Sequence, residues 1–149
     1  MAQEVVAEPG EPLVETRQER GQGDPSARRV TTDGDVLERT STNVFFDGEE
    51  WHFEPQPLEW RRVVHLDAGE LEAVREAIAS SGFMDVAPEH RPHGTSIGGT
   101  NVTWTASEGG HTHTVRLLGV PDVEVPEVTA LSQALDGTIA RAIQRAAGV

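Results

Sequence analysis

Histidines are the residues of this chain whose type and spacing come nearest to a chemical site. His90 and His93 lie within 87–99, a glycine- and proline-containing stretch that predicts a long loop. His111 and His113 are two residues apart in a segment with strand character, which places both on one face of that strand. Imidazole is a good ligand for zinc, nickel and copper. The four histidines form a candidate zinc or nickel site, with a polar strand end or a pH-sensitive contact as the alternatives.

The same loop contains Gly94–Gly98, which matches the G-x-S-x-G pattern of a hydrolase nucleophile elbow, with Ser96 as the nucleophile. That elbow needs a helix directly after the serine, whereas a strand pattern follows here. A turn is therefore the preferred interpretation, and a small hydrolase is the weaker alternative. Paired carboxylates such as Glu49 and Glu50 fall at turns or helix starts. Since no complete catalytic set is visible, we expect no enzyme activity.

Tryptophan and arginine, the residue types favoured at protein-binding hot spots, are adjacent at Trp60, Arg61 and Arg62. This run is the candidate partner-binding site. Trp51, Trp60 and Trp104 all fall on expected strands. The preferred interpretation of the three rings is that they form the core of a sheet against its helices, and an exposed aromatic patch for a partner is the alternative.

Charge and composition limit the classes of partner. The 149 residues include 25 acidic and 12 basic side chains and carry a net charge of −13. Nucleic acids and anionic membranes attract basic surfaces, so neither is an expected partner. The absence of cysteine excludes disulfide and thiol chemistry. Because no apolar run approaches the roughly 20 residues of a membrane span and no leader pattern is visible, we expect a soluble, cytoplasmic protein.

Caps and apolar periodicity predict two helices. The first spans 68–81, with Asp67 and Glu70 as a capping box and Leu66 and Leu71 as a hydrophobic staple. The second begins near Pro126, a residue suited to the first helical position. Its apolar stripe consists of Val128, Leu131, Leu135, Ile139 and Ile143.

Alternating apolar residues predict the strands. They are 35–46, the strand after Asp47-Gly48 that holds Trp51 and Phe53, 58–66, 100–106 and 111–118. Asp-Gly between apolar runs is typical of a two-residue hairpin loop, in which Phe46 would face Glu49. The order βββαββα with short connections favours an α+β fold, an antiparallel sheet of about five strands with two helices packed on one face.

The segment 1–33 has the composition of a tail. It contains prolines, glycines and few large aliphatic side chains, too little apolar surface to offset the entropy of ordering. We therefore expect an acidic segment over 1–33, flexible or ordered by a partner, followed by a single folded domain over 34–149.

One longer pattern covers roughly residues 58–143. It consists of Leu71, Val74, Ile78, Phe83, Val102-Thr103-Trp104, Gly109-Gly110, His113, Val115, Pro126, Val128, Leu131 and Leu135. This pattern resembles small bacterial proteins of unknown function, including emfourins, the proteinaceous inhibitors of thermolysin-like metalloproteases. The expected function is a small acidic, non-enzymatic protein-interaction module, of which an inhibitor is one form. The alternative is a histidine-based metal-binding protein.

Overall fold

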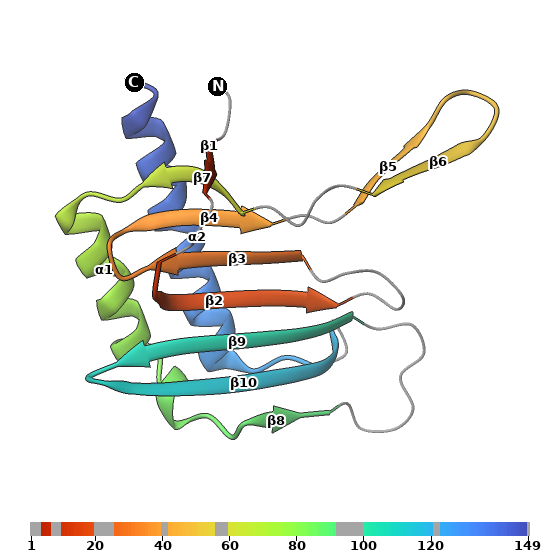
Figure 1. Cartoon of the computed structure of the whole chain (residues 1–149). Coiled ribbons are helices and arrows are strands. Elements are labelled where there is room, and N and C mark those ends of the chain that lie inside the picture. The colour runs from red at the N-terminus through yellow and green to blue at the C-terminus, as the bar shows by residue number, and fades with distance from the viewer. Residues whose placement is uncertain are drawn as a thin grey trace.

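A single sheet layer with two helices packed against one of its faces makes up the body of the protein (Figure 1). The computed structural model describes residues 4–6, 10–19, 26–39, 42–55, 60–91, 100–120 and 123–148. The strands are β1 (Glu4–Val6), β2 (Pro12–Glu19), β3 (Ser26–Thr31), β4 (Asp35–Arg39), β5 (Thr42–Phe46), β6 (Trp51–Pro55), β7 (Trp60–His65), β8 (Glu89–His90), β9 (Thr100–Glu108) and β10 (His111–Val120). The helices are α1 (Ala68–Ser80), α2 (Pro126–Ala146) and the short 3-10 helix η1 (Phe83–Asp85). The predicted α+β class is confirmed.

The main sheet is larger than predicted and mixed. Its eight strands run in the order β1-β7-β4-β3-β2-β9-β10-β8. Neighbouring strands are antiparallel except β8, which lies parallel to β10. The prediction of about five antiparallel strands is therefore wrong in number and in direction. It misses the strands within 1–33, and it misses β8 because so short a strand shows no alternation.

Strands β2 and β3 lie in the middle of this sheet, although the composition of 1–33 predicts a tail. β2 pairs with β3 on one side and with β9 on the other. Val14 and Val30 are each only 1 % exposed and belong to the main core. The prediction of a flexible tail is thus wrong for the residues described, and position 34 lies in the turn between β3 and β4. The few aliphatic residues of this segment suffice because β9 and the helices complete their surroundings.

Helix α1 begins as predicted. The Asp67 side chain accepts a hydrogen bond from the backbone N–H of Glu70, and the Glu70 side chain accepts one from the backbone N–H of Asp67, both at 2.8 Å. These contacts confirm the capping box. Gly82 follows the helix with φ 80°, and Phe83 after it is fully buried.

Helix α2 packs its apolar stripe on the same face of the sheet. Val128, Leu131, Leu135 and Ile139 are buried as predicted, whereas Ile143 is 45 % exposed, so the buried stripe ends at Ala142. Across the part of the chain that the structure describes, neither helix has the length and apolar character needed to span a membrane.

The expected strand 35–46 is divided between two sheets. β4 belongs to the main sheet, whereas among the described strands β5 pairs with β6 alone, in a separate two-stranded ribbon. The hairpin itself is confirmed, but Phe46 pairs with Trp51 and not with Glu49. The loop is longer than predicted because the Asp47 side chain accepts hydrogen bonds from the backbone N–H groups of Glu49 and Glu50, at 2.8 and 2.9 Å.

Candidate interaction surface

The face of the sheet opposite α1 and α2 carries a cluster of arginines around one tryptophan. Strand register places Glu15, Arg29, Leu37 and Arg62 in one cross-strand row. Two residues further along the strands, on the same face, it places Arg17, Ala27 and Arg39 in a second row. Trp60 lies two positions before Arg62 on β7 and forms a buried cluster with Ala27 and Leu37, separate from the main core. We call Arg17, Arg29, Arg39, Arg62 and Trp60 the arginine face.

Two guanidinium groups cover the Trp60 ring. The Cζ atom of Arg29 lies 4.7 Å from the ring centroid, and that of Arg39 lies 5.2 Å from it. Both distances fall within the range of a cation–π contact. Trp60 is only 9 % exposed, so its ring acts as a platform that holds the two arginines.

Carboxylates neutralise only part of this face. Glu15 accepts from Arg29 at 2.6 Å and from Arg17 at 2.9 Å. Asp35 lies 3.6 Å from Arg62. Among the side chains that the structure describes, no carboxylate pairs with Arg39, and its Nε is buried without a hydrogen-bond partner. The face is therefore locally positive although the whole chain has a net charge of −13.

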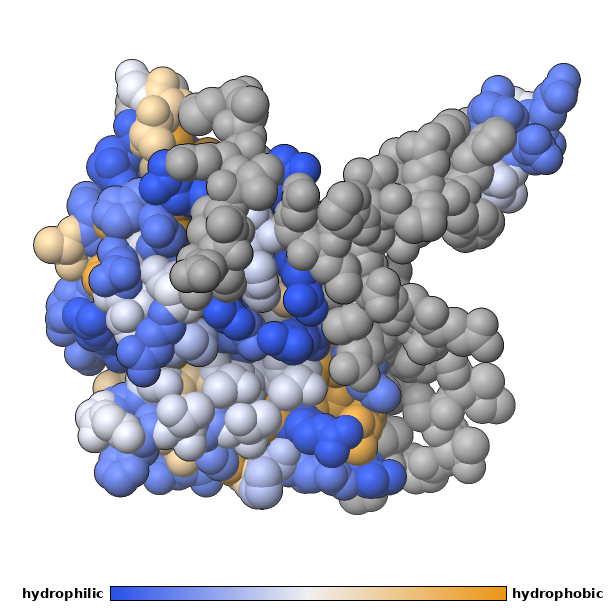
Figure 2. Space-filling model, in the orientation of Figure 1, coloured by the Kyte–Doolittle hydropathy of each residue, from blue (hydrophilic) through white to orange (hydrophobic). Residues whose placement is uncertain are grey.

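Figure 2 shows the molecule from this side. Strongly hydrophilic side chains lie over the middle strands of the sheet, where β3 and β4 are drawn in Figure 1. A surface of this kind presents planar, multidentate donors, which suit carboxylate ligands.

Only two of the three residues of the predicted partner-binding site lie on the same face of the sheet. Trp60 and Arg62 belong to the arginine face, but Trp60 is buried and does not offer its ring to a partner. Arg61 pairs in register with Glu38, one residue along from the pair of Leu37 and Arg62. Successive residues of a strand point to opposite faces, so Arg61 is not part of the arginine face. Sequence reasoning misses Arg17, Arg29 and Arg39. The available signal is the alternation of charged residues in 15–17 and the arginine pair at 28–29, which fit a solvated tail equally well.

The three tryptophans occupy three different environments. Trp104 is buried in the main core against the helices, as predicted. Trp60 is buried on the opposite face of the sheet. Trp51 is 63 % exposed at the tip of the β5–β6 ribbon. A common tryptophan core is therefore wrong.

His90, on β8, lies apart from His111 and His113, which belong to β10. His90 pairs with Leu117, four residues from His113 and six from His111. At about 3.3 Å per residue, these steps correspond to about 13 and about 20 Å along the strand. His93 lies outside the described residues, and the described ranges contain no group of three His, Cys, Asp or Glu residues that could hold a metal ion. The register thus separates His90 from the pair on β10.

Two of the histidines bind backbone carbonyls. The Nε2 atoms of His90 and His113 lie 2.7 Å from the oxygens of Ala87 and Val86, respectively. The His113 ring also packs edge-on against Phe83, with centroids 5.7 Å apart. Because a carbonyl only accepts, each Nε2 carries a proton and donates it. The His113 contact holds the segment after α1 against β10, whereas the His90 contact lies within that segment.

Ser96 and the whole of Gly94–Gly98 lie outside the described residues. On the helix side, two hollows of about 380 Å³ each lie between α2 and the sheet and share Thr16, Gln18, Trp104 and Ser132 as lining residues. Four charged residues line one of the hollows: Arg28, Glu38, Arg39 and Asp136. Of these, Arg28 and Asp136 are bound to each other at 2.6 Å. That pairing satisfies both groups instead of leaving one as a nucleophile or base.

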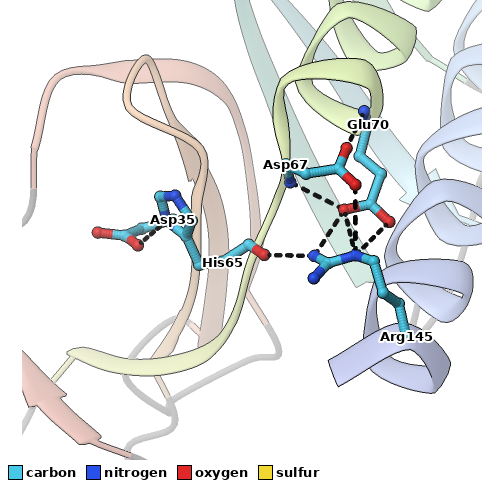
Figure 3. Close-up of polar contacts among 5 residues, drawn as sticks. All are labelled: Asp35, His65, Asp67, Glu70 and Arg145. Atoms are coloured by element: carbon cyan, nitrogen blue, oxygen red, sulfur yellow. Dashed lines mark hydrogen bonds and ion pairs between the residues drawn. The ribbon is translucent and has the colours of Figure 1, made fainter. Parts of the chain in front are cut away.

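A clamp at the other end of the sheet fixes the strand that carries Trp60 (Figure 3). Arg145 of α2 donates to the Glu70 carboxylate at 2.7 Å and to the backbone oxygen of His65 at 2.9 Å. The hydrogen bonds from Arg145 hold the pKa of Glu70 below its usual value, and the same contact raises the pKa of Arg145. His65 Nδ1 in turn lies 2.8 Å from the Asp35 carboxylate, which also faces Arg62. The clamp therefore ties both helices to the edge of the arginine face.

Neither a family model nor a curated protein matches this chain.

Proposed function

We propose that this protein is a non-enzymatic interaction module that binds an acidic segment of a partner protein on the arginine face. The observation that supports this most directly is Arg39. Its guanidinium rests on Trp60, and none of the carboxylate side chains that the structure describes pairs with it. A guanidinium that is fixed in place and lacks a carboxylate partner can bind a carboxylate of another molecule at low cost, because little side-chain entropy remains to be lost on binding.

The chemistry of the face favours carboxylates. Guanidinium groups bind a carboxylate through two parallel hydrogen bonds, which gives directional recognition. Long polyanions such as nucleic acids depend on many phosphate contacts, and a net charge of −13 opposes their approach. A short acidic peptide places a few charges on the positive face while its remainder stays clear of the acidic surface.

An inhibitor of thermolysin-like metalloproteases, the role that the emfourin resemblance implies, is a narrower form of the same proposal. In that form the acidic segment would belong to the protease.

Calorimetric titration with a short, end-blocked oligoglutamate peptide tests the proposal. We expect saturable binding that weakens as salt is raised. Arg39→Gln should weaken it about tenfold or more, the loss typical of a charge-assisted hydrogen bond. Arg75→Gln, which changes an exposed arginine on α1, is the matched control and should bind like the wild type. Undetectable binding to the wild type, or equal binding by both variants, would contradict the proposal.

A further inference from the structure

The β5–β6 ribbon is an arm that extends from the arginine face. β4 and β7 are neighbours in the main sheet, and the ribbon is the connection between them. Over the residues that the structure describes, neither β5 nor β6 pairs with a strand of that sheet, and Figure 1 shows the ribbon projecting away from the body. The arm thus starts beside Arg39, the last residue of β4, and ends at a tip formed by Asp47–Trp51.

The tip has the composition of a binding element. Asp47, Glu49 and Glu50 give it negative charge, and Trp51 is one of two exposed large apolar side chains among the described residues. The turn is fixed, since the Asp47 side chain accepts from two backbone N–H groups. An ordered turn with an exposed tryptophan loses little entropy when it docks, and tryptophan is enriched at hot spots.

The tip and the arginine face are complementary in charge. Glu49 is exposed and forms no ion pair within the described ranges, and Arg39 likewise has no carboxylate partner there. The chain from Arg39 to Asp47 spans up to about 26 Å when extended. Since the ribbon projects away from the body (Figure 1), its tip points away from its own arginine face and can reach that of another molecule.

We propose that the tip of one copy docks on the arginine face of a second copy, so that two chains exchange arms reciprocally. Glu49 of each copy pairs with Arg39 of the other, and Trp51 packs beside the guanidiniums that cover Trp60. The exchange is self-complementary and closes after two copies, as a two-fold symmetric dimer does. The inference rests on the proposed function, since it names the acidic segment that the face binds.

The test is the mass of the full chain in solution, measured by sedimentation velocity over a range of concentrations. We expect a reversible shift from 16.1 kDa to twice that mass, at concentrations that rise with added salt. Glu49→Arg and Arg39→Glu should each weaken the dimer at least tenfold, because each places like charges in contact. Glu72→Arg, on an exposed position of α1, is the control and should leave the dimer unchanged.

Mixing the two monomeric variants gives the decisive result. In a mixed pair, both contacts carry opposite charges. The arginine introduced at position 49 of one chain meets the glutamate introduced at position 39 of the other, and the unchanged Arg39 of the first chain meets the unchanged Glu49 of the second. In a pair of identical variant chains, both contacts carry like charges. The mixture should therefore dimerise more strongly than either variant alone, and this rescue also shows that both variants are folded. A wild type that stays monomeric at every concentration, or a mixture that does not dimerise, would overturn arm exchange. If oligoglutamate still binds the face in that case, the proposed function stands; if it does not, both fail.

Discussion

Arg145, near the end of α2, donates from its Nη2 to the Glu70 carboxylate in the first turn of α1 at 2.7 Å. The two residues are 75 positions apart, so their contact joins the last helix to the start of the first. It places a cation at the carboxyl end of α2 and an anion at the amino end of α1, where each helix dipole favours it. The same arginine also reaches the backbone of His65, so the contact fixes β7 as well.

Acid should weaken this clamp. The pKa of Glu70 lies below its usual value of 4.5 because the guanidinium of Arg145 donates to its carboxylate. A carboxyl group with a lowered pKa in the folded state stabilises the fold above its unfolded pKa, and that contribution is lost as pH falls through the folded value. Urea unfolding at about pH 7 and about pH 3 should therefore show a larger loss of stability in the wild type than in Glu70→Gln. Glu72→Gln is the control and should keep the wild-type pH dependence; equal losses in the wild type and Glu70→Gln would exclude the clamp as the cause.

The cap of α1 should contribute on its own. Asp67→Ala removes the oxygen that accepts from the Glu70 backbone N–H and should cost about 1 kcal/mol of unfolding free energy. Asp67→Asn retains an acceptor and should cost less. Thermal and urea unfolding measure both, and an alanine variant as stable as the asparagine variant would show that the cap contributes nothing.

The correctly predicted elements carry their signals locally. The boundaries of α1 follow from Asp67, Glu70 and Gly82, all within a turn of the helix ends. The β9–β10 hairpin follows from alternation on both sides of Gly109-Gly110. In each case the residues that determine the structure are neighbours in the sequence, so a single sequence suffices to find them.

The arginine face could not be found in this way. Arg29, Arg39 and Trp60 lie on three strands and meet only through the register of β3, β4 and β7. Strand β2 has the same difficulty, because its burial depends on β9, which follows α1 in the chain. A sequence in which charged and apolar residues alternate is found both in solvated segments and in central strands that expose one face to solvent. The pattern alone therefore does not distinguish the two.

The segment 1–33 should be essential for folding. Leu13→Ala removes a buried side chain of the main core and should cost about 2–5 kcal/mol, the range for leucine truncation in a core. Ile143→Ala changes an exposed side chain of α2 and should alter stability by less than about 0.5 kcal/mol. Equal, small effects in urea unfolding would restore the interpretation of this segment as a tail.

Zinc should leave the melting temperature unchanged, and the contribution of His113 should be structural. Its Nε2 donates to the Val86 carbonyl and its ring contacts Phe83, so His113→Ala should cost about 1–2 kcal/mol through the lost hydrogen bond and ring contact. His111→Ala changes an exposed residue and should be close to neutral.

A metal site that used both His111 and His113 would behave differently. A metal bound only by the folded state raises the melting temperature, and either substitution would remove that rise. Melting curves of the wild type and both variants, with and without saturating zinc or nickel, separate these cases. A metal-dependent rise that both variants abolish would establish the histidine site and contradict the separation of His90 from the pair on β10.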